Sequence, residues 1–338
     1  MATLYLTEQG SKLVKDHRRL VVEKDGAVIF EVPAFKVERV LIFGNVQLTT
    51  PAMSFLLENG IETSFLTVHG RLKGRLVPIQ SKNVVLRMQQ FELARDRDFS
   101  LALSSLIVEG KLRNARIVLQ RYARNHPGEA DFDGALWEIE RLIASIPRKE
   151  RIESLKGLEG RAAAVYFKAY RELFRTTISF TTRSRRPPRD PSNALLGLGY
   201  TLLAHEAVGV VSAVGFDPYV GFYHGLHYGR PSLALDLIEE FRPALVDRLV
   251  TTLLNRQVLK QDDFEEVSDE GDGERTTVYL TAEGRKKFYA SYEERMLAPF
   301  DHPRTGEQVT YRRLLCLQAQ ALAKAIVDGE EYRPFIIE

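Results

Sequence analysis

Short apolar runs separated by turn residues dominate the first 80 or so positions of the chain. Arg19 to Glu23 and Ala27 to Val32 are rich in β-branched residues and flank a turn with Asp-Gly at its tip. Val40 to Phe43 and Ile61 to Val68 are further runs of this kind, each bounded by turn residues. This pattern predicts strands.

One helix is expected to interrupt these strands. Thr50 can cap a helix start, Pro51 fits a first turn, and Asn59-Gly60 is a pair that ends helices. Three or more strands facing one helix can form an independent domain. The sequence therefore predicts a small β-rich domain over residues 1–80.

From about residue 83 the apolar residues recur at helical spacing, and long stretches contain no proline. Beyond Val84 to Tyr122, further helices are expected over Asp133 to Ile146, Gly157 to Phe174, Asn193 to Val214, Leu233 to Asn255 and Tyr311 to Asp328. Val278 to Thr281 is strand-like and follows an acidic stretch, which predicts a small hairpin. The predicted fold class is α+β, with the β-rich domain followed by a larger all-helical domain, residues 81–338, that carries this hairpin insertion.

Composition and cysteine use narrow the setting. Hydrophobic content of 44% with 27% charged residues is ordinary for a soluble globular protein. No apolar run approaches the roughly 20 residues of a membrane-spanning helix. The N-terminal residues do not show the basic stretch followed by an apolar stretch that is typical of a secretory signal. Cys316 is the only cysteine, which excludes an intramolecular disulfide. A cytoplasmic protein with no membrane role is expected.

Charge is distributed unevenly although the net charge is only +2. Ser81 to Asn125 holds nine Lys/Arg against four Asp/Glu, and Arg161 to Arg189 holds eight against one. The segment from Asp262 to Glu274 holds eight carboxylates and no basic residue. The basic stretches either attract phosphate backbones or form solvated helix faces, and charge alone does not decide between these interpretations.

The first candidate for chemistry is an acidic residue between two glycines. The sequence contains no Walker loop, no GxGxxG, no GxSxG and no zinc-type Cys/His spacing. Glu159, between Gly157-Leu158 and Gly160, is predicted to begin an alanine-rich helix whose small residues permit close approach by another segment. The alternative is an ordinary first-turn acid that the helix dipole favours.

Two further segments hold a histidine and a group of carboxylates. The aromatic, glycine-bounded loop from Gly215 to Gly225 contains His224, with His227 as a competitor; a structural histidine bonded to a backbone carbonyl is the alternative. In the segment Gly229 to Pro243, Ser232 is a candidate helix cap. Three carboxylates share one helix face, and two arginines are available to pair with them: Asp236, Glu239, Glu240, Arg230 and Arg242.

Two glutamates and one histidine from these separate segments form a plausible site for a divalent cation. Carboxylate oxygens suit Mg²⁺, and an imidazole shifts the preference towards Mn²⁺. Residue spacing does not establish that the three side chains meet.

Four segments in this order resemble the CRISPR-associated spacer-acquisition integrase family. They are LEGRAAAVYF at Leu158 to Phe167, DPSNALL at Asp190 to Leu196, GFDPYVGFYH at Gly215 to His224, and GRPSLALDLIEEFRP at Gly229 to Pro243. Weaker similarity extends over nearly the whole chain. The resemblance implies that Glu159, His224 and Glu239 bind the metal and that Asp236 supports the site; spacing favours Glu239 over Glu240.

The resemblance also implies an activity and its partners. It implies a metal-dependent DNA endonuclease and integrase, with Mg²⁺ or Mn²⁺, in which a donor 3′-hydroxyl attacks a phosphodiester of the repeat array. It further implies double-stranded and branched DNA as substrates, a homodimer formed through the β-rich domain, and a small ferredoxin-like CRISPR adaptation partner protein. Phosphate contacts are expected from Arg161, Arg183, Arg185, Arg186, Arg189 and Arg230; a flexible basic linker is the alternative for the segment Arg183 to Arg189.

Two other functions remain compatible with these residues. One is a metal-dependent nuclease that acts on branched DNA in repair, without integration. The other is a non-catalytic nucleic-acid scaffold in which the carboxylates are structural.

Overall fold

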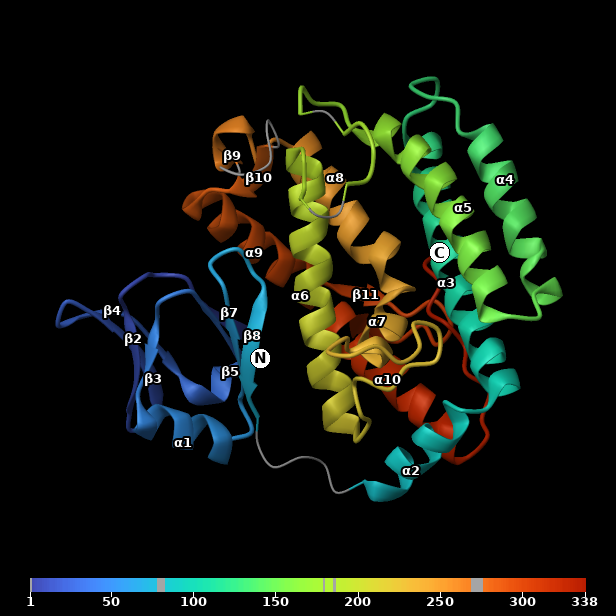
Figure 1. Cartoon of the computed structure of the whole chain (residues 1–338). Coiled ribbons are helices and arrows are strands. Elements are labelled where there is room, and N and C mark those ends of the chain that lie inside the picture. Colours follow the sequence, from blue (N-terminus) through green and yellow to red (C-terminus); the bar gives the residue numbers. More distant parts are fainter. Residues whose placement is uncertain (1, 78–82, 179, 185–186, 269–275) are drawn as a thin grey trace. The chain divides into compact units, whose positions relative to one another are not determined.

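The computed structural model describes residues 2–77, 83–178, 180–184, 187–268 and 276–338 (Figure 1). The chain divides into two compact units, residues 1–80 and 81–338. Each unit has its own secondary structure.

The N-terminal unit consists of two four-stranded sheets and one helix. The strand order is β1-β5-β7-β8 in the first sheet, where only β8 is antiparallel to its neighbour, and β4-β3-β2-β6 in the second. The bounds are β1 Ala2–Leu6, β2 Lys12–Asp16, β3 Arg19–Lys24, β4 Ala27–Pro33, β5 Val37–Phe43, β6 Gln47–Leu48, α1 Thr50–Glu58, β7 Glu62–Leu66 and β8 Leu72–Leu76, with a 3₁₀ turn at Ala34–Lys36.

Local sequence explains these elements. Asp25 and Gly26 have φ angles of 51° and 79°, as the tight turn between β3 and β4 requires. Helix α1 is capped one residue earlier than expected, because the Thr49 hydroxyl accepts a hydrogen bond from the Ala52 amide at 3.4 Å. Leu13 and Leu56 are fully buried in a core that the two sheets and α1 share. The predicted β-rich N-terminal region is confirmed.

The C-terminal unit is mainly helical. Its helices are α2 Val84–Leu93, α3 Arg97–Asn125, α4 Asp133–Ala144, α5 Ile152–Tyr170, α6 Pro191–Val214, α7 Ser232–Ile238, α8 Arg248–Asn255, α9 Ala282–Leu297 and α10 Tyr311–Val327. Short 3₁₀ turns lie at Ile146–Arg148, Arg171–Leu173 and Gln261–Asp263, and Arg242–Asp247 is a π-helical segment. Helices α3, α4 and α5 pack on one another, and α6 contacts α7 and α10 (Figure 1).

The α+β fold class with a hairpin insertion is confirmed. Strands β9 (Phe264–Ser268) and β10 (Thr276–Leu280) pair antiparallel, and the tip of the acidic stretch lies outside the described residues. Sequence analysis missed a second hairpin, β11 (Pro299–Asp301) with β12 (Gln308–Thr310), and helix α9. Helix α9 is rich in charged residues, which hides the spacing of its few buried apolar positions.

One predicted helix is interrupted. The expected run Leu233 to Asn255 is divided into α7, the π-helical segment and α8. Pro243 lies in this segment, and it cannot donate a hydrogen bond to the carbonyl four residues back. Single-turn π segments are frequent at functional sites. Glu239, a predicted ligand, directly follows α7 in the region where the helical path changes.

Helix α6 has the length and apolar composition of a membrane span, which the sequence analysis did not expect. Its 18-residue window has a mean hydropathy of 1.5, but 78% of that window is buried inside the protein. The polar residues Asn193 and Glu206 lie in α6 and are buried as well. The packing of α6 is therefore that of a core helix.

Candidate active site

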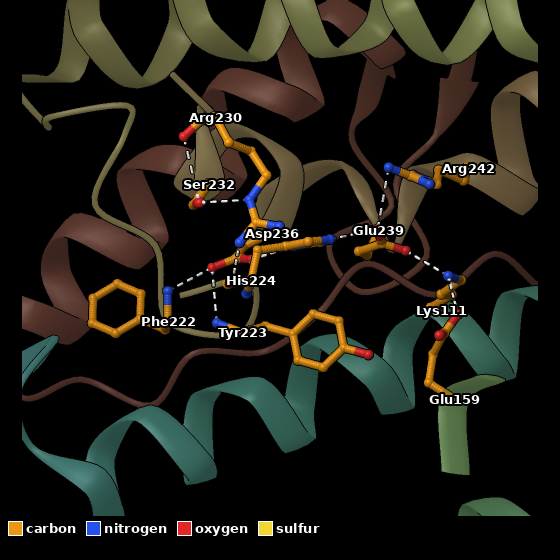
Figure 2. Close-up of polar contacts among 10 residues, drawn as sticks. All are labelled: Lys111, Glu159, Phe222, Tyr223, His224, Arg230, Ser232, Asp236, Glu239 and Arg242. Carbon is orange, nitrogen blue, oxygen red and sulfur yellow. Dashed lines mark hydrogen bonds and ion pairs between the residues drawn. The ribbon is translucent and has the colours of Figure 1, made fainter. Parts of the chain in front are cut away.

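A single buried carboxylate fixes the loop that carries His224. Asp236, on α7, is 1% exposed. Its Oδ2 accepts hydrogen bonds from the amides of Phe222 (2.6 Å) and Tyr223 (3.0 Å), and its Oδ1 accepts one from the amide of His224 (2.9 Å). Figure 2 shows these three bonds converging on one side chain. The loop conformation is therefore set by α7.

The same carboxylate orients the imidazole of His224. Nδ1 of His224 lies 2.7 Å from Oδ1 of Asp236, and because a carboxylate only accepts, Nδ1 is the protonated nitrogen. In the neutral ring Nε2 then keeps its lone pair, and it faces Glu239 with 3.8 Å between Nε2 and Oε1. His227 does not share this environment, because it is exposed and its ring contacts only the adjacent Tyr228 carbonyl among the contacts described.

Gly221 makes the close approach of loop and helix possible. A Cβ atom at this position would lie 2.7 Å from the carbonyl carbon and from Cβ of Ser232, and 2.8 Å from Oδ2 of Asp236. Ser232 was predicted to cap α7, but it is the first residue of the helix and makes no side-chain cap. Its hydroxyl instead accepts a hydrogen bond from Nε of Arg230 at 3.3 Å.

Gln90 holds the start of the same loop from another helix. Its Nε2 donates to the carbonyls of Asp217 (2.8 Å) and Val220 (2.7 Å), and its Oε1 accepts from the amide of Asp217 (2.9 Å). The side chain is fully buried, so each of its polar atoms has its partner in the loop. Helices α2 and α7 thus clamp the segment before His224 at both ends.

Glu159 lies in the middle of a helix. Helix α5 begins at Ile152, so the prediction that Glu159 starts a helix is wrong, and the first-turn alternative fails with it. An added Cβ at Gly157 or Gly160 would meet nothing within 4 Å, so these glycines do not mark a close contact. Glu159 instead projects from α5 to Lys111 of α3, with 2.5 Å between Oε1 and Nζ.

Lys111 joins the two predicted glutamate ligands. Its Nζ lies 2.6 Å from Oε2 of Glu239 as well as 2.5 Å from Glu159, as Figure 2 shows. Burial alone lowers the pKa of Lys111, but the carboxylates of Glu239 and Glu159 outweigh it and raise that pKa above its usual value. The side-chain amine of Lys111 is therefore protonated at neutral pH.

Glu239 is a buried carboxylate next to two cations and the imidazole of His224. Burial raises its pKa, but Arg242, Lys111 and His224 together lower the pKa of Glu239 to about 2. Nη2 of Arg242 lies 3.2 Å from Oε1 of Glu239, so this arginine pairs with one of the helix carboxylates, as the sequence allowed. Among the described contacts, Arg230 does not pair with Glu239 and instead donates to the His224 carbonyl. Oε2 of Glu239 is buried and lies 2.6 Å from Nζ of Lys111.

Glu240 points away from this cluster. Its carboxylate accepts hydrogen bonds from Gln318 (2.8 Å) and from the Phe335 amide (3.1 Å), and burial raises its pKa to about 8. Asn114 of α3 bonds the Glu240 carbonyl at 2.7 Å and the Phe335 carbonyl at 2.8 Å. Glu240 therefore ties the C-terminal segment to α7, while Glu239 faces His224.

The donor set fits a divalent cation. Two carboxylates, which Lys111 joins, and one imidazole whose Nε2 faces Glu239 suit Mg²⁺ or Mn²⁺. As placed, no group of three His, Cys, Asp or Glu side chains in the described part of the chain is already within metal-ligating distance. Lys111 lies between the two glutamates, where a cation is attracted.

The predicted phosphate-binding arginines are dispersed. Arg183 donates to Oδ1 of Asn193 at 2.7 Å and packs on the Tyr200 ring, so its guanidinium is partly engaged. Arg161 is exposed and pairs with Glu138 at 2.6 Å, and Arg189 is exposed. Arg185 and Arg186 lie outside the described residues. Arg230 borders the His224 loop.

Lys111 and Gln90 were not among the site residues predicted from the sequence. Lys111 lies one heptad after buried Ser104 and one before buried Val118, so it lies on the buried stripe of α3. A lysine on such a stripe signals a buried partner of opposite charge. Gln90 bonds only to backbone atoms 127 to 130 positions away, and no local pattern reveals such contacts.

Known proteins share this fold. A casposase bound to its integration product matches 99% of this chain and 93% of its own, with a TM-score of 0.86 and 22% identity. A chain of a Cas6-RT-Cas1–Cas2 complex matches 98% of this chain with 36% of its own length, at a TM-score of 0.80 and 26% identity. The fold is thus the one that Cas1 proteins and casposases have in common.

Sequence comparison is more specific. The CRISPR-associated endonuclease Cas1 3 of Thermus thermophilus is 36% identical over 342 residues, which cover 100% of this chain and 98% of the relative. The family model of the CRISPR associated protein Cas1 matches residues 4–294. The chain belongs to the CRISPR-associated Cas1 family of endonucleases.

Proposed function

We propose that the protein is a metal-dependent DNA endonuclease and integrase that inserts new spacers into a CRISPR array by transesterification. The observation that carries the proposal is the proximity of Glu159, Glu239 and His224, which come from three separate segments: the buried ammonium of Lys111 joins the two glutamates, and Nε2 of His224 faces Glu239. Buried carboxylates are costly unless paired or metal-bound, so this cluster is a site for positive charge.

Each side chain has a part in this function. Glu159 and Glu239 would hold the metal through their carboxylates, and His224 through Nε2. When bound, Mg²⁺ or Mn²⁺ supplies a Lewis acid for the phosphoryl oxygens and lowers the pKa of a bound hydroxyl. Asp236 keeps Nδ1 of His224 protonated and its ring oriented, at 2.7 Å. Arg242 lowers the negative charge of the cluster by pairing with Glu239.

The substrates follow from this chemistry and from the family. A donor 3′-hydroxyl attacks a phosphodiester of the repeat. The hydroxyl loses its proton as the new P–O bond forms and the old one breaks, and the departing 3′-oxygen takes up a proton. Double-stranded and branched DNA are the proposed substrates, and water in place of the donor gives hydrolysis. Because a related complex contains Cas2, a small ferredoxin-like Cas2 protein is the proposed partner.

Strand joining is the first test. Wild-type protein, with its Cas2 partner, is incubated with repeat-containing DNA and a labelled donor in Mn²⁺, Mg²⁺ or EDTA. We expect joined products with either metal, and none in EDTA or with a donor that lacks the 3′-hydroxyl. Metal-dependent cleavage of branched DNA without joining would favour the repair nuclease, and DNA binding without any reaction would favour the scaffold.

The β-rich unit is the proposed homodimer surface. Strand β4 is an edge of its sheet, and apolar side chains on it are exposed, including Val28 (59%) and Phe30 (49%). An exposed apolar edge strand favours pairing with another chain. Phe30→Asp is expected to weaken dimerisation at least about tenfold by light scattering after gel filtration. Glu58→Lys, on the exposed side of α1, is the control, and an unchanged dimer in the Phe30 variant would contradict the assignment.

A further inference from the structure

We propose that Lys111 is a built-in counter-cation of the active site, which must be displaced before a divalent cation binds and which thereby sets the affinity of the site for metal. The inference rests on the proposed function, because it assumes that Glu159 and Glu239 are the metal ligands. It assigns to Lys111 the role of a positioning residue.

The ammonium of Lys111 lies within contact distance of both glutamates. Nζ of Lys111 lies 2.5 Å from Oε1 of Glu159 and 2.6 Å from Oε2 of Glu239. Divalent cations lie about 2.0 to 2.6 Å from carboxylate oxygens. The ammonium therefore occupies the space between the two carboxylates that would hold the metal, so the two cations would exclude each other.

Lys111 neutralises negative charge in a largely buried place. The side chain of Lys111 is 16% exposed and that of Glu239 is 3% exposed. Among the described residues Lys111 is the one cationic side chain that pairs with Glu159, whereas Glu239 also pairs with Arg242. Without Lys111 and without metal, the two carboxylates would repel each other across a poorly solvated gap.

Helix α3 holds the backbone of Lys111 in place. Lys111 lies near the middle of the 29-residue helix α3, and Asn114, one turn later, bonds the Glu240 carbonyl at 2.7 Å. Helix α3 is thereby fixed to the end of α7, so the position of the Lys111 backbone relative to Glu239 is fixed as well. Only the flexible four-carbon stem of the lysine can move away.

Two neutral variants and one charged variant test the inference. Mn²⁺ binding is measured by the electron paramagnetic resonance signal of the free ion, for the full chain and for Lys111→Met, Lys111→Gln and Lys111→Arg. Binding that persists in Glu159→Gln, including any to the acidic stretch, is subtracted. Removing a competing charge a few ångströms from a divalent ion is expected to tighten binding at least about tenfold in both neutral variants. Lys111→Arg keeps the charge and is expected to remain within about threefold of wild type or to bind more weakly.

The outcomes separate this inference from the proposed function. Tighter binding in the neutral variants, with a lower melting temperature in the absence of metal, supports displacement. Equal or weaker binding there, with normal binding in wild type, overturns the role of Lys111 and leaves the metal site standing. Binding in no variant, or binding that Glu159→Gln does not reduce, overturns the metal site and this inference together. Should the Met variant fail to fold, the Gln variant decides by the same criterion.

Discussion

Replacing His224 with alanine is expected to abolish metal-dependent cleavage and strand joining while the protein stays folded. The imidazole is the one nitrogen donor among the three proposed metal ligands, with Nε2 3.8 Å from Oε1 of Glu239. Loss of a metal ligand removes several kcal/mol of transition-state stabilisation, so the rate should fall at least about a thousandfold. The measurement compares both proteins on branched and repeat-containing DNA in Mn²⁺, after circular dichroism has shown matching folds.

His227→Ala is the matched control. His227 lies three positions further along the same loop, but it is exposed and contacts its neighbour's carbonyl rather than Asp236 or Glu239. It should therefore retain activity within about threefold of wild type, since exposed substitutions usually have small effects. Equal activity in wild type and His224→Ala would remove His224 from the site, and equal loss in both variants would point to the loop as a whole.

Substitution of Asp236 by alanine is expected to be the most destabilising change near the site. Three backbone amides and the imidazole of His224 share this one carboxylate, which is 1% exposed. Leaving several buried donors unpaired costs about 3 to 5 kcal/mol. Unfolding in denaturant, monitored by circular dichroism, measures the change in the free energy of unfolding.

Asp236→Asn separates the lost acceptors from the lost volume. Asparagine keeps the shape and one acceptor oxygen, so its cost should lie between those of wild type and Asp236→Ala. Its amide cannot accept from Nδ1 of His224 and from all three backbone amides at once, so metal affinity should still fall about 10- to 100-fold. A cost below about 1 kcal/mol for Asp236→Ala would mean that the loop holds its conformation without the carboxylate.

The sequence predicted the α+β class and most helices because apolar periodicity is a local property that survives in the fold. It also singled out Glu159, His224, Asp236 and Glu239, which the structure links by a series of contacts. Lys111 joins Glu159 to Glu239, His224 faces Glu239, and Asp236 bonds His224. Their roles as metal ligands stay a prediction. Spacing by itself left open whether these side chains meet, because they belong to three segments.

Local signals failed where tertiary contacts decide. The glycines around Glu159 were interpreted as a helix start, yet α5 begins seven residues earlier, at Ile152, and continues through both of them. Glycine is tolerated within a helix at a cost of about 1 kcal/mol, so packing against α3 and α4 can outweigh it. Ser232 is likewise a residue that often caps helices, but here its hydroxyl accepts a hydrogen bond from Arg230.

The apolar helix α6 has a consequence for the synthesis of the protein. Helices α7 and α10, against which it packs, follow it in the chain, so at about 5 to 20 residues per second α6 waits several seconds for its covering. During that interval a hydrophobic segment long enough to span a bilayer is exposed to chaperones and to the membrane-insertion machinery. Glu206 lies near its middle, and a charge at such a position opposes insertion by about 2.5 to 3.5 kcal/mol. In the folded protein the same carboxylate pairs with Arg312 of α10 at 3.2 Å, so a residue whose charge disfavours membrane insertion of α6 during synthesis also forms an ion pair in the core.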